Sequence, residues 1–279
     1  MSSILTNTSA MVALQTLKSI NSNLAKTQDE ISTGKSVASA KDNAAIWSIA
    51  QNMTADVKLF ESISSALGMG EATVSAALTG AEEIVTTLNE MSKLAASATS
   101  ENADYDKINE QLTSLKEKID GIVDASQFNG ANLLMDTVDG TATTFNIISA
   151  ANREGSNAPE MVYITVDAQD LKTDVQDATL TTIADNGTAE DVIGEIEDMR
   201  AAVLTAAATL GTAKAQITDQ GTFIGKLSDS LKRGISTLGD ADMEAASARL
   251  QALQVQQQLA TQSLSIANQA PQNILSLFR

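Results

Sequence analysis

The chain has 279 residues, a net charge of −17 and 43% hydrophobic residues, of which few are aromatic. This content suffices for a buried core, and the shortage of aromatic side chains favours long helices packed through aliphatic residues. The absence of His and Cys excludes Ser-His-Asp and Cys-His catalysis, disulfides and metal sites built on those ligands. The strong acidity argues against a nucleic-acid partner, because phosphate binding needs clustered Lys and Arg.

The charge is unevenly distributed along the chain. Residues 1–41 have a net charge of +2, and residues 250–279 contain one base and no acid. The stretch 42–249 holds 33 acids and 13 bases. Uncharged ends fit an assembly whose subunits pack through them, since like charges cannot be stacked densely in a buried interior. They fit equally a helical hairpin with a polar, uncharged face.

The first two expected helices show heptad patterning. Apolar residues recur at alternating three- and four-residue steps over 10–31 and again over 63–98, which places them on one seam of each helix. Ser32-Thr33-Gly34-Lys35-Ser36 interrupts the first helix. Ser100, Asn102 and Asp104 indicate the end of the second helix and the cap of a third.

The third helix and the segment after it follow the same reasoning. A heptad seam runs over 105–122 and ends before the turn signal Gln127-Phe128-Asn129-Gly130. Residues 138–185 differ in kind, because Thr143–Ile148 and Met161–Val166 are β-branched and alternating. They predict two short strands, with Pro159 between them, that form a small hairpin.

The last part of the chain returns to helix. A heptad seam spans 196–231, and Gly234 and Gly239 are expected to interrupt that helix. Residues 241–268 are helical with two apolar stripes, which requires two packing partners in a water-exposed helix. One stripe contains Leu250, Leu253, Ala260, Leu264 and Ala267, and the other contains Val255, Leu259 and Ile266. The N-terminal helix can cover one stripe and a neighbouring subunit the other.

The sequence shows no catalytic grouping. Asp240, Asp242 and Glu244 form an acidic cluster, but Ala245 stands where a calcium loop needs Gly, so the cluster is interpreted as a helix cap. No membrane-spanning run and no cleaved signal peptide are expected. The interpretation is a structural, non-enzymatic protein without metal or cofactor.

Several motifs resemble those of bacterial flagellins. Ser39-Ala40-Lys41-Asp42-Asn43-Ala44-Ala45 is similar to their SAKDDAA stretch, and Phe128-Asn129-Gly130 with Asn132-Leu133-Leu134 resembles their FNG…LL turn. The opening Ile4-Leu5-Thr6-Asn7 resembles INTN. Asp240–Glu244 and the end of the chain resemble the C-terminal signatures, and Ser247–Phe278 is especially similar to α-proteobacterial flagellins.

The resemblance implies a mainly α fold, in which both chain ends form a long coiled-coil helical rod with a small β-hairpin insert. Residues 1–40 and 236–279 would form the terminal coiled coil of the filament core. Residues 41–137 and 186–235 would form a helical rod, and 138–185 a surface insert without large outer domains. The implied function is a subunit that polymerises into the flagellar filament for swimming motility.

The resemblance also implies partners and a location. The partners are further copies of the chain, the flagellar export apparatus, a flagellin export chaperone, the filament cap and the hook-junction proteins. The protein would be extracellular, in the flagellum. It would be exported unfolded, with terminal helices that fold only on assembly.

Specific residues are assigned to these roles. The hinge and inter-layer contact would involve Gly34, Lys41, Asp42, Trp47 and Gly239. Many flagellins have an Arg-rich stretch around 89–94 that the host innate flagellin receptor reads, and Glu90 stands there instead, which predicts weak or absent activation. Residues expected to pack the polymer core are Leu5, Leu14, Leu17, Ile20, Leu24, Ile31, Leu250, Leu253, Leu259, Leu264, Ile266, Ile274, Leu275 and Leu277.

Three alternatives stay open at this point. A hook–filament junction protein would share the terminal helices, although the full C-terminal signature and the short insert argue against it. A non-polymerising coiled-coil adaptor would be a small oligomer with stable ends. A binding or enzymatic role in the insert would require Thr143–Val166 to fold over a pocket.

Overall fold

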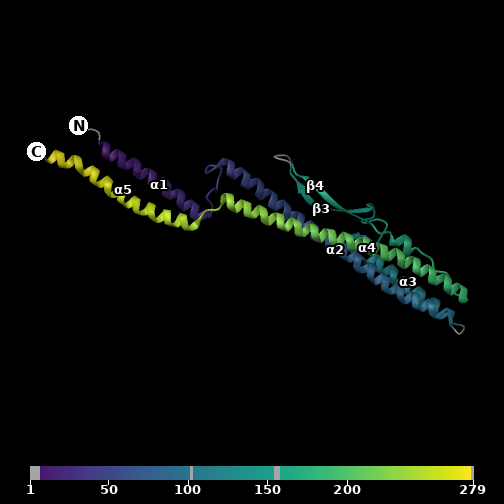
Figure 1. The fold of residues 1–279 in the computed structure, drawn as a ribbon. Helices are drawn as coiled ribbons and strands as arrows, with labels where there is room; N and C mark the ends of the chain where they lie inside the picture. The colour runs from purple at the N-terminus through teal and green to yellow at the C-terminus, as the bar shows by residue number, and fades with distance from the viewer. Residues whose placement is uncertain (1–6, 101–102, 154–157, 278–279) are drawn as a thin grey trace. The chain divides into compact units, whose positions relative to one another are not determined.

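The structure is a computed structural model that describes residues 7–100, 103–153 and 158–277, with side chains described as far as residue 269. It is mainly helical with a small β portion, which confirms the expected fold class (Figure 1). The helices are α1 (Thr8–Thr33), α2 (Ala44–Ser97), α3 (Tyr105–Ala125), α4 (Asn186–Gly239) and α5 (Met243–Leu277), and Lys172–Gln176 forms a π-helical turn, η1. The strands are β1 (Gln127–Phe128), β2 (Ala131–Asn132), β3 (Thr144–Asn152) and β4 (Glu160–Asp167).

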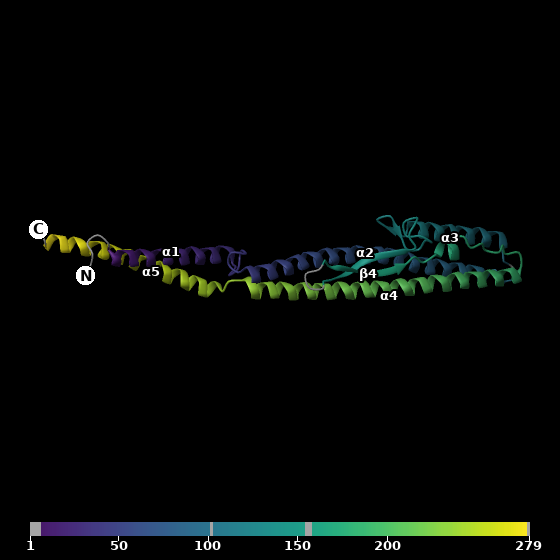
Figure 2. The same cartoon turned by 90° about the horizontal axis from the view of Figure 1, so that it is seen from above.

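The chain divides into two compact units. The terminal unit comprises Met1–Val57 with Asp229–Arg279, and the central unit comprises Lys58–Ser228. In the terminal unit α1 and α5 lie side by side in both views (Figures 1 and 2). They run antiparallel, because Asn7 contacts Ala267 at one end and Glu30 contacts Arg249 at the other.

The helix ends follow local capping chemistry. The Asn7 side chain accepts a hydrogen bond from the Ala10 N–H at the start of α1, which ends at Gly34 in the left-handed conformation (φ 70°), as predicted. The Asp242 carboxylate accepts from the N–H groups of Glu244 and Ala245. This confirms that the acidic cluster caps a helix.

The predicted break at Gly234 is wrong, because α4 continues to Gly239. A Cβ at Gly234 would lie 2.7 Å from the Met53 Cε. Gly234 is therefore a position of close approach between α4 and the start of α2, and that approach explains a glycine inside a long helix better than a break does.

The core of the central unit is built on the predicted heptad seams. All eleven positions of the predicted seam over 63–98 are buried, ten of them in α2 and the last, Ala98, directly after its end. In α3 the buried residues are Ile108, Leu112, Ile119 and Val123, so the seam ends one residue later than expected. A four-residue step from Ile119 keeps the next side chain on the same face of a helix with 3.6 residues per turn.

Two hairpins follow α3. The first, β1–β2, turns through Asn129 and Gly130 with φ of 51° and 82°, which confirms the predicted turn and fits the left-handed pair that tight hairpins require. The second, β3–β4, is antiparallel with an irregularity between Ile148 and Ala150. It confirms the two predicted strands.

The β3–β4 hairpin lies against α2 at Gly70 and against α4 at Gln220. Both are heptad-seam positions that carry no large apolar side chain. A Cβ at Gly70 would lie 2.5 Å from the Ile147 Cδ1. The Gln220 Nε2 donates to the carbonyl of the irregular residue Ser149 at 2.9 Å. Gly70 thus makes room for the hairpin, and Gln220 satisfies a buried carbonyl of the hairpin.

Candidate assembly surface of the terminal helices

The contact between α1 and α5 uses the predicted seam. On α1 the heptad residues Leu17, Ile20, Leu24 and Ile31 are half-buried, and Thr27 is buried. On α5 Leu253 is buried, and Leu250 and Leu264 are half-buried. Of the two apolar stripes expected on α5, this is the one that packs on α1.

The second stripe of α5 is uncovered. Val255, Leu259 and Ile266 are 55%, 58% and 65% exposed. At 100° per residue they lie about 200–240° around the helix from Leu253, on the side opposite α1. We name these three residues the α5 stripe. It is a row of large apolar side chains that the single chain leaves in water.

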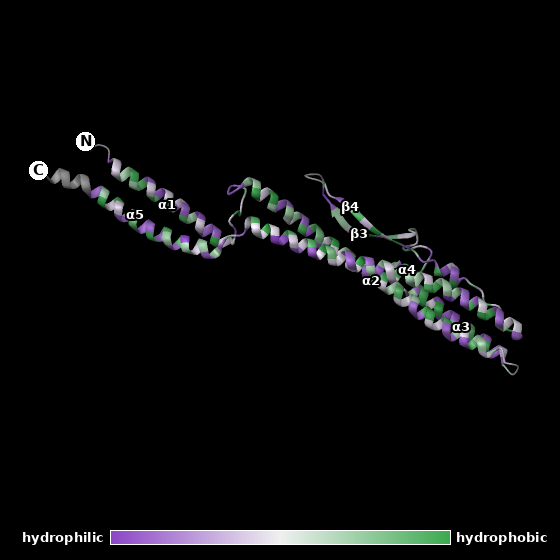
Figure 3. Cartoon of the chain, in the orientation of Figure 1, coloured by the Kyte–Doolittle hydropathy of each residue, from purple (hydrophilic) through white to green (hydrophobic). Residues whose placement is uncertain are grey.

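The start of α1 is also apolar outside its seam. Met11, Val12 and Leu14 are each more than half exposed. Leu14, expected to pack the polymer core, therefore lies outside the contact with α5. Figure 3 shows hydrophobic and hydrophilic residues mixed along α1 and α5.

Polar contacts fix the register of the two helices. The Asn7 Nδ2 donates to the Ala267 carbonyl at 2.8 Å, and the Gln257 Nε2 donates to the Asn21 Oδ1 at 2.7 Å. Sequence reasoning missed these residues. Only Asn7 carried a signal, as an Asn directly before a predicted helix.

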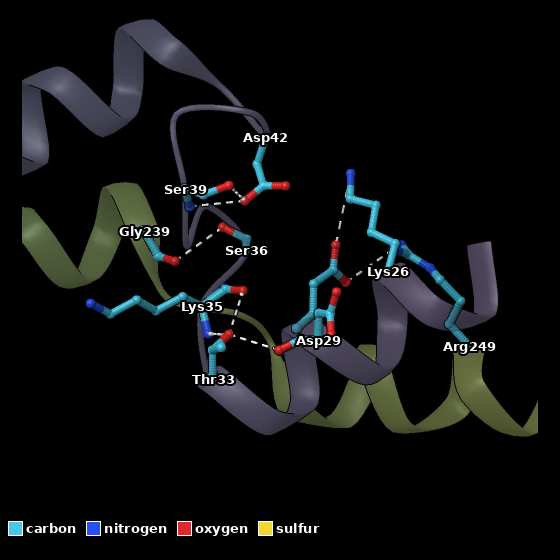
Figure 4. A network of polar contacts seen from close by, with 10 residues as sticks. Lys26, Asp29, Thr33, Lys35, Ser36, Ser39, Asp42, Gly239 and Arg249 are labelled. Atoms are coloured by element: carbon cyan, nitrogen blue, oxygen red, sulfur yellow. Dashed lines mark hydrogen bonds and ion pairs between the residues drawn. The ribbon is translucent and has the colours of Figure 1, made fainter. Parts of the chain in front are cut away.

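Glu30 forms a small ion-pair cluster across the same contact. Its carboxylate lies 4.0 Å from the Lys26 Nζ and 3.9 Å from the Arg249 Nη1 (Figure 4). These partly exposed pairs contribute little stability, typically below about 1 kcal/mol each. Their effect is to favour one register of α5 along α1.

The two linkers of the terminal unit are joined by backbone hydrogen bonds. The Ser36 N–H donates to the Gly239 carbonyl at 2.8 Å, and the Ala241 N–H donates to the Gly34 carbonyl at 2.9 Å. The Ser36 hydroxyl also donates to the Gly239 carbonyl, at 3.2 Å (Figure 4). Between them Lys35 and Asp240 form an antiparallel bridge. The two chain crossings are thus one short two-stranded element rather than two independent linkers.

The other predicted hinge residues surround this element. The Asp42 carboxylate accepts from both the N–H and the hydroxyl of Ser39 at 2.9 Å, and these hydrogen bonds lower the pKa of Asp42. Gly239 is buried, Trp47 is half-buried and Lys41 is exposed. Asp42 therefore orders the linker just before α2 begins.

Some predicted site residues lie elsewhere. Glu90 is exposed on α2 and lines a groove of about 500 Å³ with Lys93 and Leu115 between α2 and α3. Four predicted residues lie outside the described residues, either entirely or in their side chains: Leu5, Ile274, Leu275 and Leu277.

Within the described residues no group of three or more Asp and Glu side chains is placed to hold a metal ion. Over the same part of the chain, no helix has the length and apolar character needed to cross a membrane. The α5 stripe and the exposed start of α1 consist of large apolar side chains, which suits them to covering by other protein.

Comparison with known proteins agrees with this arrangement. Residues 4–139 match the bacterial flagellin N-terminal helical region, and residues 193–278 match the bacterial flagellin C-terminal helical region. A flagellin of Brucella melitensis is 42% identical with full coverage of both chains. Flagellin FljK of Caulobacter vibrioides is 38% identical over all of this chain and 99% of its own length. Flagellin C of Rhizobium meliloti is 32% identical over the full length of both chains.

Proposed function

The chain belongs to the bacterial flagellin family and is a structural subunit of the flagellar filament, and we propose that its copies polymerise by covering the α5 stripe of each subunit. The single observation that carries this proposal is the two-sided apolar character of α5. One side packs on α1, and on the other side no described residue covers Val255, Leu259 and Ile266, which are all more than half exposed.

The terminal helices depend on neighbouring copies for their stability. Across the described side chains of α1 and α5, only Thr27, Ala246 and Leu253 are buried. Ordering the backbone of each residue costs about 1–2 kcal/mol, which two helices with so small a core do not offset. The proposal is therefore that both helices fold fully only on an existing filament end, which confines growth to that end.

The remaining parts of the proposal follow from family membership. The filament is extracellular, so the subunit must leave the cell. We propose export in an unfolded state without a cleaved signal peptide, through the flagellar export apparatus and with a flagellin export chaperone. The filament cap and the hook-junction proteins complete the expected partners.

Seeded polymerisation tests the role of the α5 stripe. Leu259→Gln with Ile266→Gln removes two large side chains from the stripe, each worth roughly 1–2 kcal/mol on burial. We expect the monomer concentration that sustains growth to rise at least about 30-fold, measured by electron microscopy and sedimentation with short filament seeds. Leu204→Gln is the matched control, since Leu204 is 48% exposed on α4 of the central unit.

The outcomes separate the proposal from its alternatives. Wild-type protein that stays monomeric with seeds, or a double variant that grows like the Leu204→Gln control, would contradict assembly through the α5 stripe. A chain lacking residues 250–279 should not elongate seeds at all. Hydrogen exchange adds an independent readout, because residues 8–33 and 243–269 should exchange rapidly in the monomer and slowly in the filament.

A further inference from the structure

The acidic residues are concentrated in one part of the chain. Residues 76–213 hold 24 acidic and seven basic side chains, whereas the rest of the chain holds 11 of each. Within the central unit, residues 58–75 of α2 and 214–228 of α4 together hold three acids and three bases. This part of the central unit is therefore neutral. Copies of so acidic a chain can approach closely only where their charge is low.

A groove lies in this neutral part, between α2 and α4. It has a volume of about 370 Å³. The residues that line it include Ser64, Gly68, Glu71, Thr218, Gly221 and Thr222. We name it the α2–α4 groove.

The packing of the single chain does not explain the glycines of this groove. A Cβ at Gly68 or at Gly221 would meet no atom within 4 Å, and neither residue has a positive φ. Glycine inside a helix is unfavourable relative to alanine. Gly194 and Gly211 are open in the same way, but Gly68 and Gly221 line one groove from its two helices, where the missing side chains permit a close approach by atoms from outside the chain.

The groove and the β3–β4 hairpin occupy opposite sides of the α2–α4 pair at the same level. Gly70 meets the hairpin and Gly68 lines the groove, and these positions are 200° apart on a helix. On α4, Gln220 bonds to the hairpin while Thr218 and Thr222 line the groove, with the same angular separation.

The outward face of the hairpin presents a suitable side chain. Tyr163 is 53% exposed and pairs with Ile148 across the strands, next to the hydrogen-bonded pair Asn146 and Thr165. The side chains beside Tyr163 on this face, Ile148, Asn146 and Thr165, are uncharged, and the acid Asp167 lies at the far end of the strand. A tyrosine ring fits a narrow cleft between small residues, and its hydroxyl can donate to the Glu71 carboxylate or bond to the Thr218 hydroxyl.

We propose that Tyr163 of one copy inserts into the α2–α4 groove of a neighbouring copy in the filament. Because Tyr163 and the groove lie on opposite sides of one unit, the contact is heterologous and can repeat from copy to copy, as a filament requires. The proposal rests on the filament function, and it names a contact in the central unit that the α5 stripe does not supply.

Cross-linking tests the contact directly, because the natural chain contains no cysteine. Filaments of the Tyr163→Cys, Thr222→Cys double variant, treated with a short thiol-specific cross-linker, should give a ladder of covalent multimers on a denaturing gel. Filaments of the Tyr163→Cys, Gly194→Cys variant are the matched control and should give monomers. Gly194 is also an exposed glycine of α4, in the acidic part.

The single Tyr163→Cys variant distinguishes the proposed geometry from a symmetric one. It should not cross-link, whereas covalent dimers from it would show hairpin-to-hairpin contact and overturn the proposal. Double-variant filaments that form but yield only monomers, or that cross-link no more than the Gly194→Cys control, would also overturn it. Wild-type chains that form no filament would instead refute the proposed function.

Filling the groove provides a second readout. Gly221→Leu should slow seeded elongation at least ten-fold relative to Gly194→Leu, while neither variant lowers the melting temperature of the monomer. Both changes replace an open helical glycine with a good helix former, so lost elongation cannot be attributed to misfolding. Equal elongation of the two variants would contradict the insertion of Tyr163.

Discussion

Gly80 provides the sharpest test of the packing within the central unit. It is buried in α2, and an added Cβ would collide with the Ser126 Oγ, lie 2.8 Å from the Ser126 Cβ and lie 3.1 Å from the Leu134 Cδ1. Ser126 cannot easily turn away, because its hydroxyl donates to the Ile122 carbonyl at 2.6 Å. Gly80→Ala should therefore force α2 away from the end of α3.

The magnitude follows from opposing contributions. Alanine in a helix interior is favoured over glycine by about 1 kcal/mol. Overpacking costs about 1–3 kcal/mol, and loss of the Ser126 hydrogen bond adds about 1 kcal/mol. We expect Gly80→Ala to lower the free energy of unfolding by about 1–3 kcal/mol. Gly194→Ala should raise it by up to about 1 kcal/mol, because no atom lies near an added Cβ there.

Chemical denaturation followed by circular dichroism measures both variants in the full-length monomer. Adding Ser126→Gly to Gly80→Ala should recover part of the lost stability, because it removes both colliding atoms. If Gly80→Ala stabilised the monomer as much as Gly194→Ala, the close contact between α2 and Ser126 would be refuted. A double variant no more stable than Gly80→Ala would place the strain elsewhere.

Three further predictions concern separate features. Gly70→Ala should loosen the β3–β4 hairpin and lower its protection in hydrogen exchange, because the three atoms nearest to an added Cβ all belong to the Ile147 side chain. Adding Ile147→Val to Gly70→Ala should partly restore that protection. The pKa of Asp104 is lowered by the hydrogen bonds that its carboxylate accepts from Lys107. The ionised carboxylate therefore stabilises the folded chain above the unfolded pKa of about 3.9, and this stabilisation is lost as the pH falls through the lower pKa of the folded state. Asp104→Asn should therefore reduce the loss of α3 helicity in an acid titration followed by circular dichroism. Glu90→Arg should raise activation of the host innate flagellin receptor in reporter cells, where the natural chain should give little.

Heptad periodicity predicted the helices well because it depends on local geometry alone. Every position of the predicted seam from Ile63 to Ala98 is buried, and Gly34 ends α1 as its conformation requires. Gly234 misled the prediction, because a helical glycine can mark either a break or a close approach. Only the position of Met53, on a helix distant in sequence, decides between the two.

The candidate assembly surface was only partly predictable. Two apolar stripes on α5 follow from spacing, but the sequence could not say which one α1 covers. The register is set by contacts such as Asn7 with Ala267, which join residues 260 positions apart. Such pairs leave no periodic signal, because single polar contacts between distant helices depend on the tertiary arrangement.

The two units differ in what their stability depends on. The central unit buries long seams from α2, α3 and α4 within one chain, so its folding needs no partner. Only three described side chains of α1 and α5 are buried, and the α5 stripe is left in water, so the stability of these helices depends on subunit concentration. A substitution in the central core should therefore change the melting of the monomer. A substitution in the α5 stripe should leave that melting unchanged and instead change the concentration at which filaments grow.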